Sequence, residues 1–208
     1  MFKDIDQICK KLISEFDLIP VDRKEKLQLI STYISRKFAS NETPKLIVVC
    51  THNSRRSHIG QLWLAVAAAY FQLPAVETFS GGTEATAFNT RAVNAIKNIG
   101  FQVNVSQEEE AEANNPIYQI SWKSDMEPYV TFSKKYDSAP NPKTKFGAIM
   151  VCTEADQGCP VIAGSDFRLA LPFEDPKAFD DTDLETEKYD ERLNDIGREI
   201  LYAMSEVR

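Results

Sequence analysis

Short apolar runs that alternate with helical patterns constrain the fold of this 208-residue chain more than any other feature. Residues 45–50 and 146–152 each hold a continuous apolar run, which is typical of strands buried on both faces. A third short run, residues 76–79, ends in Ser-Gly-Gly. Helical periodicity appears in three segments: 57–72, 88–98 and 184–207. Strands that alternate with helices favour parallel pairing through crossover helices, so the sequence predicts a layered α/β domain.

Two further helical patterns precede the first strand. Residues 2–16 and 22–38 place apolar side chains at helical spacing and predict a helical hairpin. A polar stretch that ends in Pro44 follows them and breaks the pattern. We therefore expect an N-terminal helical extension over residues 1–42 and the α/β domain over residues 45–208.

Residues 106–145 interrupt the alternation and are interpreted as an insertion. Two short runs, residues 117–122 and 129–133, flank Ser124-Asp125 and predict a β-hairpin. The aromatic side chains of this hairpin are too apolar to stand free in water. We expect the insertion to pack on the domain or on a second subunit.

Charge and cysteine content narrow the classes of function. The formal net charge is −7, which argues against a general nucleic-acid or anionic-membrane surface but leaves room for a local anion site. No apolar run reaches bilayer length and the amphipathic N-terminus is not a signal peptide, so a cytoplasmic location is the default. Thiols there are mostly reduced. The four cysteines are then expected to be core residues, metal ligands or redox groups: Cys9, Cys50, Cys152 and Cys159.

The stretch LIVVCTHNSRRSH, residues 46–58, has the chemistry of an oxyanion site. A buried strand ends at Cys50, a tight polar loop follows, and a helix begins near Ser57, so backbone N–H groups and a helix N-terminus converge on the loop. Arg56 supplies a planar fork for two anion oxygens, and the same field stabilises a thiolate at Cys50. Asn53 can fix the loop through its amide, and Ser57 can donate to the thiolate or cap the helix. The residues expected to bind the anion are Thr51, His52, Asn53, Ser54, Arg55, Arg56 and Ser57.

Both histidines of the chain lie in this stretch. His52 and Arg55 either add positive potential around the anion or face solvent, and His58 is expected in helix packing. A metal held by Cys50, His52 and His58 is disfavoured, because no fourth ligand is evident and a metal would occupy the anion site. We expect neither a metal nor a cofactor.

A second cysteine pair follows another strand. Cys152 ends a buried run, and Cys159 comes after six intervening residues. As a zinc half-site the pair lacks a second pair. Two core residues are an alternative, although Asp156-Gln157-Gly158 is not core-like. The carboxyl ends of neighbouring parallel strands share one crevice, so Cys50 and Cys152 are expected to face each other.

The pattern C-x5-R-S with an internal asparagine, placed between a buried strand and a helix, resembles the active-site loop of low-molecular-weight protein tyrosine phosphatases. It also resembles the loop of their relatives, the thioredoxin-coupled arsenate reductases, to which the motifs of the chain taken together are closest. The resemblance covers residues 45–105 and 146–208 and implies a flavodoxin-like three-layer α/β/α fold with a central parallel sheet. It implies that Cys50 is a nucleophile and Arg56 an oxyanion clamp. It gives supporting roles to Asn53 and Ser57.

Two more segments carry the resemblance. The spacing Cys152-x6-Cys159, followed by proline, resembles the redox segment of the arsenate reductases. The Asp-Pro pair at Asp175 resembles the general-acid loop of the superfamily, in which Asp175 would protonate the departing oxygen. A plain Asp-Pro turn is the alternative, and Glu174 is the nearest competitor for the role.

The resemblance favours a thiol-based arsenate reductase, whose substrate, arsenate, is a small oxyanion. Cys50 would attack arsenic, Cys152 would attack the Cys50 sulfur and release arsenite, and Cys159 would attack Cys152. A thioredoxin-like dithiol would then reduce the Cys152–Cys159 disulfide. The alternative is a phosphatase that works through a phosphocysteine at Cys50, and a third possibility is an oxyanion binder without catalysis.

Two expectations about moving or covering parts follow. Gly158 and Pro160 disfavour a regular helix, so residues 153–165 are expected to be mobile and to refold on oxidation. The insertion at residues 106–145 would border the active-site crevice as a lid, or else form a dimer contact or simple cover.

Overall fold

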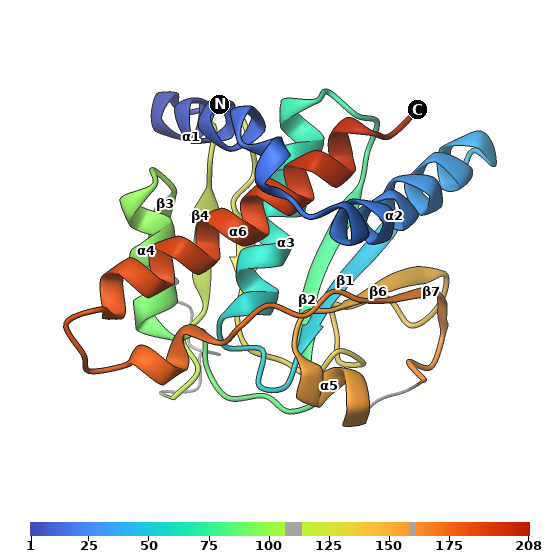
Figure 1. Cartoon of the computed structure of the whole chain (residues 1–208). Helices are drawn as coiled ribbons and strands as arrows, with labels where there is room; N and C mark the ends of the chain where they lie inside the picture. Colours follow the sequence, from blue (N-terminus) through green and yellow to red (C-terminus); the bar gives the residue numbers. More distant parts are fainter. Residues whose placement is uncertain (107–113, 159–160) are drawn as a thin grey trace.

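The computed structural model describes residues 1–106, 114–158 and 161–208, and a parallel sheet lies at its centre (Figure 1). The sheet has four strands in the order β2-β1-β6-β7, and each neighbouring pair is parallel. The strands are β1 (Lys45–Cys50), β2 (Glu77–Gly82), β6 (Phe146–Met150) and β7 (Ser165–Ala170). Cys159 and most of the acidic part of the predicted insertion lie outside the described residues.

The two continuous apolar runs form the two inner strands of the sheet. Every residue of β6, and every residue of β1 after Lys45, is buried. A strand covered on both faces has no need of polar positions, which explains why these runs do not alternate. Because β1 lies between β2 and β6, its last residue, Cys50, is flanked by two neighbouring strand ends.

Helices flank the sheet, which confirms the predicted three-layer α/β/α architecture. Contacts with the strands come from α3 on β1 and β2, from α2 on β7 and from α5 on β1 and β6. The helices around the domain are α3 (Arg56–Tyr70), α4 (Thr90–Asn98), α5 (Thr153–Gly158) and α6 (Glu185–Ser205). None of the helices within the described ranges is long and apolar enough to cross a membrane.

The expectation that a regular helix is disfavoured after Cys152 is wrong for residues 153–158. This segment forms the short helix α5. Gly158 is its last residue and Pro160 lies beyond it, so neither occupies the helix interior, where each would be costly.

The long C-terminal helix α6 connects the N-terminal helices to the domain. The chain begins with α1 (Lys3–Ser14), the short 3-10 helix η1 (Phe16–Leu18) and α2 (Val21–Ala39). Both α1 and α2 pack on α6, and more extensively than on each other (Figure 1). Gly197 allows α6 to approach α3 closely, because a Cβ there would lie 2.5 Å from the ring of Trp63.

The insertion contributes to a second, antiparallel sheet in the order β3-β4-β5. Its strands are β3 (Gln102–Val105), β4 (Tyr118–Ser121) and β5 (Tyr129–Thr131). The pairing of β4 with β5 confirms the predicted hairpin, and β3 from the segment after α4 joins it. Residues 134–136 then return beside the end of β2, where Gly82 N donates to Lys134 O at 2.9 Å. Gly81 permits this approach, since a Cβ there would lie 2.4 Å from the Tyr136 Cα.

Candidate active site at the carboxyl end of strand β1

The anion loop, residues 51–56, begins directly after Cys50 and ends with Arg56, the first residue of α3. The Cys50 Sγ lies 3.1 Å from the Ser57 Oγ, and Asn53 Nδ2 donates to the same Oγ at 2.8 Å. Because Ser57 Oγ accepts the Asn53 proton, its own proton is free to point at the sulfur. Cys50 is only 4% exposed, so a thiolate there would depend on such donors rather than on water.

Asn53 adopts a left-handed backbone with φ of 44°, which asparagine tolerates better than most residues. Its side chain is buried and connects two parts of the chain. Oδ1 accepts from the backbone N of Lys134 at 2.8 Å, while Nδ2 reaches Ser57. The expected loop-fixing contact therefore exists, and its second partner comes from the insertion.

The carbonyl groups of the anion loop are bonded to surrounding segments. Glu84 N donates to Thr51 O at 2.8 Å, and Asn89 N donates to Ser54 O at 2.9 Å. The His52 carbonyl accepts from Ser133 Oγ at 3.0 Å. With these oxygens held outward, the loop keeps its N–H groups and the N-terminus of α3 for an anion.

Arg56, the first residue of α3, contacts the segment that carries the predicted acid. Its Nη1 donates to Phe173 O at 2.7 Å, and its Nη2 donates to Asp175 Oδ2 at 2.5 Å. The Asp175 Oδ1 accepts from Lys177 N at 3.0 Å and caps the 3-10 helix η2 (Pro176–Phe179). The predicted clamp and the predicted acid therefore lie in direct contact.

Glu174, the competing carboxylate, points away from this cluster. Its side chain is 89% exposed and lies 3.3 Å from Arg192. The geometry therefore favours Asp175 over Glu174 as the carboxyl group beside the anion loop.

Cys152 lies near the anion loop, as expected from the strand order. Its Sγ is 3.3 Å from Oγ1 of Thr51, the residue that follows Cys50, and the side chain is buried. The predicted partner Cys159 lies outside the described residues. Cys9 is a buried free thiol in α1, and burial raises its pKa to about 12, which keeps it protonated and unreactive.

The remaining predicted anion-binding side chains have other partners. The His52 ring is half exposed and lies 3.7 Å from Glu84. The Arg55 guanidinium, predicted either to add positive potential around the anion or to face solvent, donates to Tyr189 and Asp180 and is only 12% exposed. Ser54 is buried and contributes its carbonyl to the loop framework described above.

His58 is a buried packing residue. It stacks on Phe88 with ring centroids 4.1 Å apart, and its Nδ1 lies 3.1 Å from Ser80 Oγ. Burial, with a smaller contribution from the charge of Lys134, lowers the pKa of His58 well below its usual value. The ring is therefore neutral at pH 7. In the part of the chain that the structure describes, no group of three or more His, Cys, Asp or Glu side chains is arranged to hold a metal.

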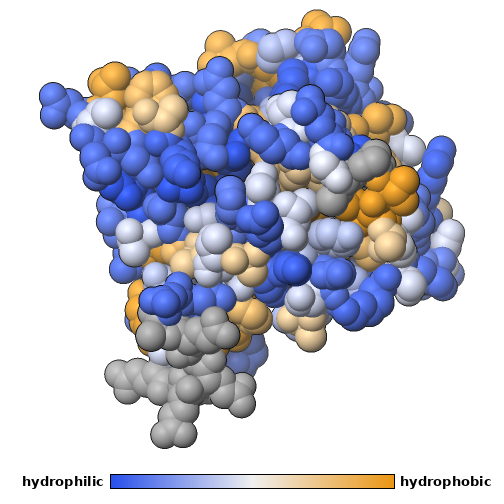
Figure 2. Space-filling model, turned by 90° about the horizontal axis from the view of Figure 1, so that it is seen from below, coloured by the Kyte–Doolittle hydropathy of each residue, from blue (hydrophilic) through white to orange (hydrophobic). Residues whose placement is uncertain are grey.

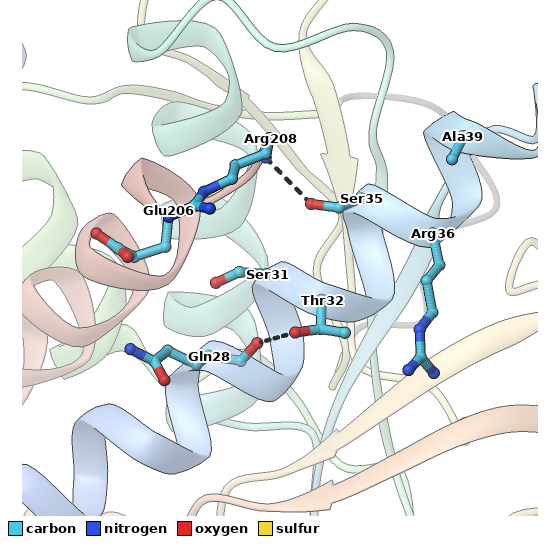
Figure 3. Close-up of a pocket in the computed structure, with 8 residues that line it drawn as sticks. All are labelled: Gln28, Ser31, Thr32, Ser35, Arg36, Ala39, Glu206 and Arg208. Atoms are coloured by element: carbon cyan, nitrogen blue, oxygen red, sulfur yellow. Dashed lines mark hydrogen bonds between the residues drawn. The ribbon is translucent and has the colours of Figure 1, made fainter.

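Two hollows deserve comparison. A cavity of about 760 Å³ borders the anion loop at His52, Ser54 and Arg55, and its other walls come from residues 86–90, from the insertion and from Lys177. The surface around the carboxyl ends of the strands is mostly hydrophilic with small apolar patches (Figure 2). A separate cavity of about 580 Å³ lies between α2 and residues 206–208, and none of the predicted site residues lines it (Figure 3).

Several residues around the anion loop carried no sequence signal. Ser133 and Lys134 contact it from the insertion, and Asp180 and Tyr189 bind Arg55. They lie between 81 and 134 positions from their partners, a separation that no local spacing pattern spans.

Comparison with solved structures places this geometry in a known fold. A low-molecular-weight protein tyrosine phosphatase from T. tengcongensis superposes with a TM-score of 0.50 at 14% identity, over 78% of this chain and 99% of that one. A low-molecular-weight phosphotyrosine phosphatase from Vibrio cholerae O395 gives 0.48 at 14% identity, over 76% and 93%. A mutant of YwlE from Bacillus subtilis gives 0.46 at 12% identity, over 78% and 97%.

The chain thus has the fold of the low-molecular-weight protein tyrosine phosphatases, with the anion loop at the end of β1. Neither the family models nor the curated proteins that were compared match this chain.

Proposed function

We propose that this protein is a cysteine-dependent phosphatase that hydrolyses phosphate monoesters at Cys50. The observation that carries the proposal is the contact of Arg56 with Asp175, because it brings the groups for charge stabilisation and proton transfer together beside the loop that follows Cys50. The fold shared with solved phosphatases supports it.

In the first step the phosphoryl group occupies the anion loop. Its oxygens accept from the loop N–H groups and from Arg56, whose fork matches two of them. The Cys50 thiolate attacks phosphorus, so an S–P bond forms while the ester P–O bond breaks. Asp175 gives its proton to the departing alcohol oxygen.

In the unliganded protein Arg56 Nη2 is occupied by Asp175 Oδ2. A bound phosphoryl group competes for this donor, which releases the Asp175 carboxyl to face the leaving group. Oδ1 can keep its bond to Lys177 N, so the carboxyl group turns without losing its anchor.

In the second step water hydrolyses the phosphocysteine. Asp175, now ionised, accepts a proton from the attacking water, and the S–P bond breaks. The thiolate of Cys50 leaves with the hydrogen bond from Ser57 Oγ, 3.1 Å away, to stabilise its charge.

Arsenate reduction is the second candidate, and the contact between Cys152 and Thr51 favours it. Cys50 would attack arsenic(V) with loss of water. Cys152 would then attack the Cys50 sulfur, the S–As electron pair would stay on arsenic, and arsenite would leave. Attack of Cys159 on Cys152 would free Cys50, and a thioredoxin-like dithiol would reduce the final disulfide.

This relay ranks second because helix α5 follows Cys152 directly. A disulfide brings two Cα atoms to within about 7 Å, whereas seven helical residues rise roughly 10 Å. The helix would have to unwind for the bond to form.

One experiment separates the candidates. Aryl phosphate hydrolysis and arsenate reduction with a thioredoxin system are measured side by side on the wild type, Cys50→Ser and Cys152→Ser. A phosphatase loses hydrolysis with Cys50→Ser and keeps it with Cys152→Ser. Arsenate turnover that disappears with Cys152→Ser would establish the reductase instead. Oxyanion binding with no turnover in either assay would leave a non-catalytic binder.

A further inference from the structure

Arg55 and its two partners form a closed triangle of hydrogen bonds. Arg55 Nε donates to Tyr189 Oη at 2.6 Å, and Arg55 Nη2 donates to Asp180 Oδ2 at 2.9 Å. Tyr189 Oη donates in turn to Asp180 Oδ1 at 2.8 Å. The triangle joins the anion loop, the segment after η2 and helix α6. The Arg55 side chain is only 12% exposed, so the charge-assisted bonds are largely shielded from water.

The triangle is placed at one end of the segment that carries Asp175. At the start of this acid segment, residues 173–181, Arg56 holds Phe173 O and Asp175. At its end, Arg55 holds Asp180. Two consecutive arginines of the anion loop, Arg55 and Arg56, thus bind the two ends of the acid segment.

A second tether holds the same end of the acid segment from α4. Arg91 bonds Asp181 at 2.5 Å and Glu185 at 2.6 Å. The Asp181 N also donates to Glu185 Oε2 at 2.7 Å. The far end of the segment is therefore fixed to the domain independently of Arg56.

Substrate binding affects the contacts of Arg56 and those of Arg55 differently. The proposed function requires Arg56 to bind phosphoryl oxygens, so its bond to Asp175 must open. Arg55 does not share that task, because both its Nε and its Nη2 already have partners on Tyr189 and Asp180. The acid segment is then held only at its far end, which Arg91 ties to α4 and the Arg55 triangle ties to the anion loop itself.

We propose that Arg55, with Asp180 and Tyr189, is a positioning unit that keeps Asp175 over the anion loop once the phosphoryl group has taken Arg56. This inference rests on the proposed phosphatase function. Arg55 contacts neither the nucleophile nor the acid and acts through the backbone of the acid segment. Its planar fork allows one side chain to reach both Tyr189 and Asp180, which an ammonium group on a single stem does not reproduce.

The consequence is a dependence on the leaving group. Protonation by a general acid contributes roughly 10²–10⁴-fold, but only when the departing oxygen needs a proton. An unsubstituted phenol or an alcohol needs it, whereas dinitrophenolate leaves almost unaided. Displacing Asp175 therefore slows phenyl phosphate much more than 2,4-dinitrophenyl phosphate.

The test measures kcat/KM for both substrates on the full-length protein. We expect Arg55→Ala to lower the value for phenyl phosphate at least about 10-fold more than that for dinitrophenyl phosphate. Asp175→Asn sets the largest ratio. When Arg55→Ala is combined with Asp175→Asn, it should add no further leaving-group dependence, because the acid that Arg55 positions is already absent.

Conservative and matched variants protect the test against misfolding. Tyr189→Phe and Asp180→Asn each remove one side of the triangle and should show the same selective loss to a smaller degree. Lys37→Ala removes a similarly shielded ion pair, to Asp166 at 2.6 Å, at the start of β7. It should change both substrates by the same factor.

Equal losses on both substrates for Arg55→Ala, with Asp175→Asn still selective, would overturn the positioning role and leave the phosphatase intact. If the wild-type protein turned over neither ester, the proposed phosphatase function and the positioning role of Arg55 would both be overturned.

Discussion

At the scale of single residues, the proposed function asks most of Arg56, since the guanidinium that holds Phe173 O and Asp175 would also have to bind phosphoryl oxygens during turnover. We expect Arg56→Ala to reduce kcat/KM for an aryl phosphate on the order of 10²–10³-fold or more, as removal of an oxyanion donor does. Arg56→Lys is the matched control: it keeps the charge but loses the fork, and it should recover only part of the loss. Near-normal turnover by Arg56→Ala would remove the arginine from the mechanism.

Lys134 is a buried cation whose stability cost can be measured. Its side chain is 6% exposed, and its ammonium donates to the Phe132 carbonyl at 3.2 Å. Over the described ranges no carboxylate lies within ion-pair distance of it. Burial lowers the pKa of Lys134 to about 8. The unfolded chain keeps the proton up to about pH 10.4, so the free energy of unfolding should rise between these two values as the folded state releases it.

Replacement of this lysine should therefore stabilise the protein at neutral pH. We expect Lys134→Met to raise the free energy of unfolding at pH 7 by on the order of 3 kcal/mol, with the gain vanishing above about pH 10. The exposed neighbour Lys135 provides the control, and Lys135→Met should be nearly neutral. Urea titrations at pH 7 and pH 10 measure both. A gain of equal size at the two pH values would show that the lysine charge is not the cause.

At the scale of elements, the insertion supports the anion loop directly. Ser133 Oγ donates to His52 O, and Lys134 N donates to Asn53 Oδ1. The Asn115 side chain binds the Ser133 backbone twice: its Nδ2 donates to Ser133 O, and its Oδ1 accepts from Ser133 N. We propose that this part of the insertion stiffens the loop, and the lid role at the crevice remains a prediction that hairpin deletion would test. Unchanged preference between small anions and bulky phosphopeptides in a folded deletion variant would oppose the lid.

Helix α5 gives a second test at this scale. If the protein reduces arsenate, formation of the Cys152–Cys159 bond should unwind residues 153–158 and accelerate backbone hydrogen exchange there. Exchange is compared between the reduced protein and protein after one arsenate turnover without reductant, with disulfides identified by mass spectrometry. The variant Cys152→Ser is the control and should show no change. Four free thiols after arsenate exposure would favour the phosphatase.

At the scale of the whole molecule, the N-terminal helices are connected to the site. Arg23 of α2 donates to Pro172 O at 3.0 Å and binds Glu199 of α6. Its guanidinium also lies over the Phe173 ring, 4.8 Å from the centroid. Phe173 is the residue whose carbonyl binds Arg56. We propose that residues 1–42 fold as part of the domain rather than as a separable extension.

Leu12 tests this integration. It is fully buried, and a Cβ at Gly197 would lie 2.9 Å from its Cδ1, so α1 packs tightly on α6 at this point. We expect Leu12→Ala to lower the free energy of unfolding by about 2–5 kcal/mol in urea, through lost apolar burial and a cavity. The exposed Lys11→Ala should change it little. An unchanged midpoint for Leu12→Ala would mean that α1 is not part of the cooperative unit.

Local patterns predicted what local physics controls. The apolar run that forms β1, the loop after Cys50 and the start of α3 occupy a few consecutive residues, so their spacing alone predicts that Cys50, Asn53 and Ser57 lie together. The same holds for the hairpin of β4 and β5, whose two runs are joined by one turn. The sequence pattern does not predict helix α5, because a glycine disfavours a helix only in its interior, and Gly158 is the last residue of this one.

The sequence by itself determined the alternation of strands and helices and the residues of the anion loop, because these rest on contacts between near neighbours in the chain or on the burial pattern of single elements. Only the tertiary structure decided that Arg55 turns to Asp180 and Tyr189, that Lys134 bonds Asn53, and that β3 joins the hairpin. These pairings join segments far apart in the chain. The partner of a polar side chain in such a pairing depends on how helices and sheets pack against one another. The periodicity of a sequence carries no information about packing between segments that are far apart in the chain.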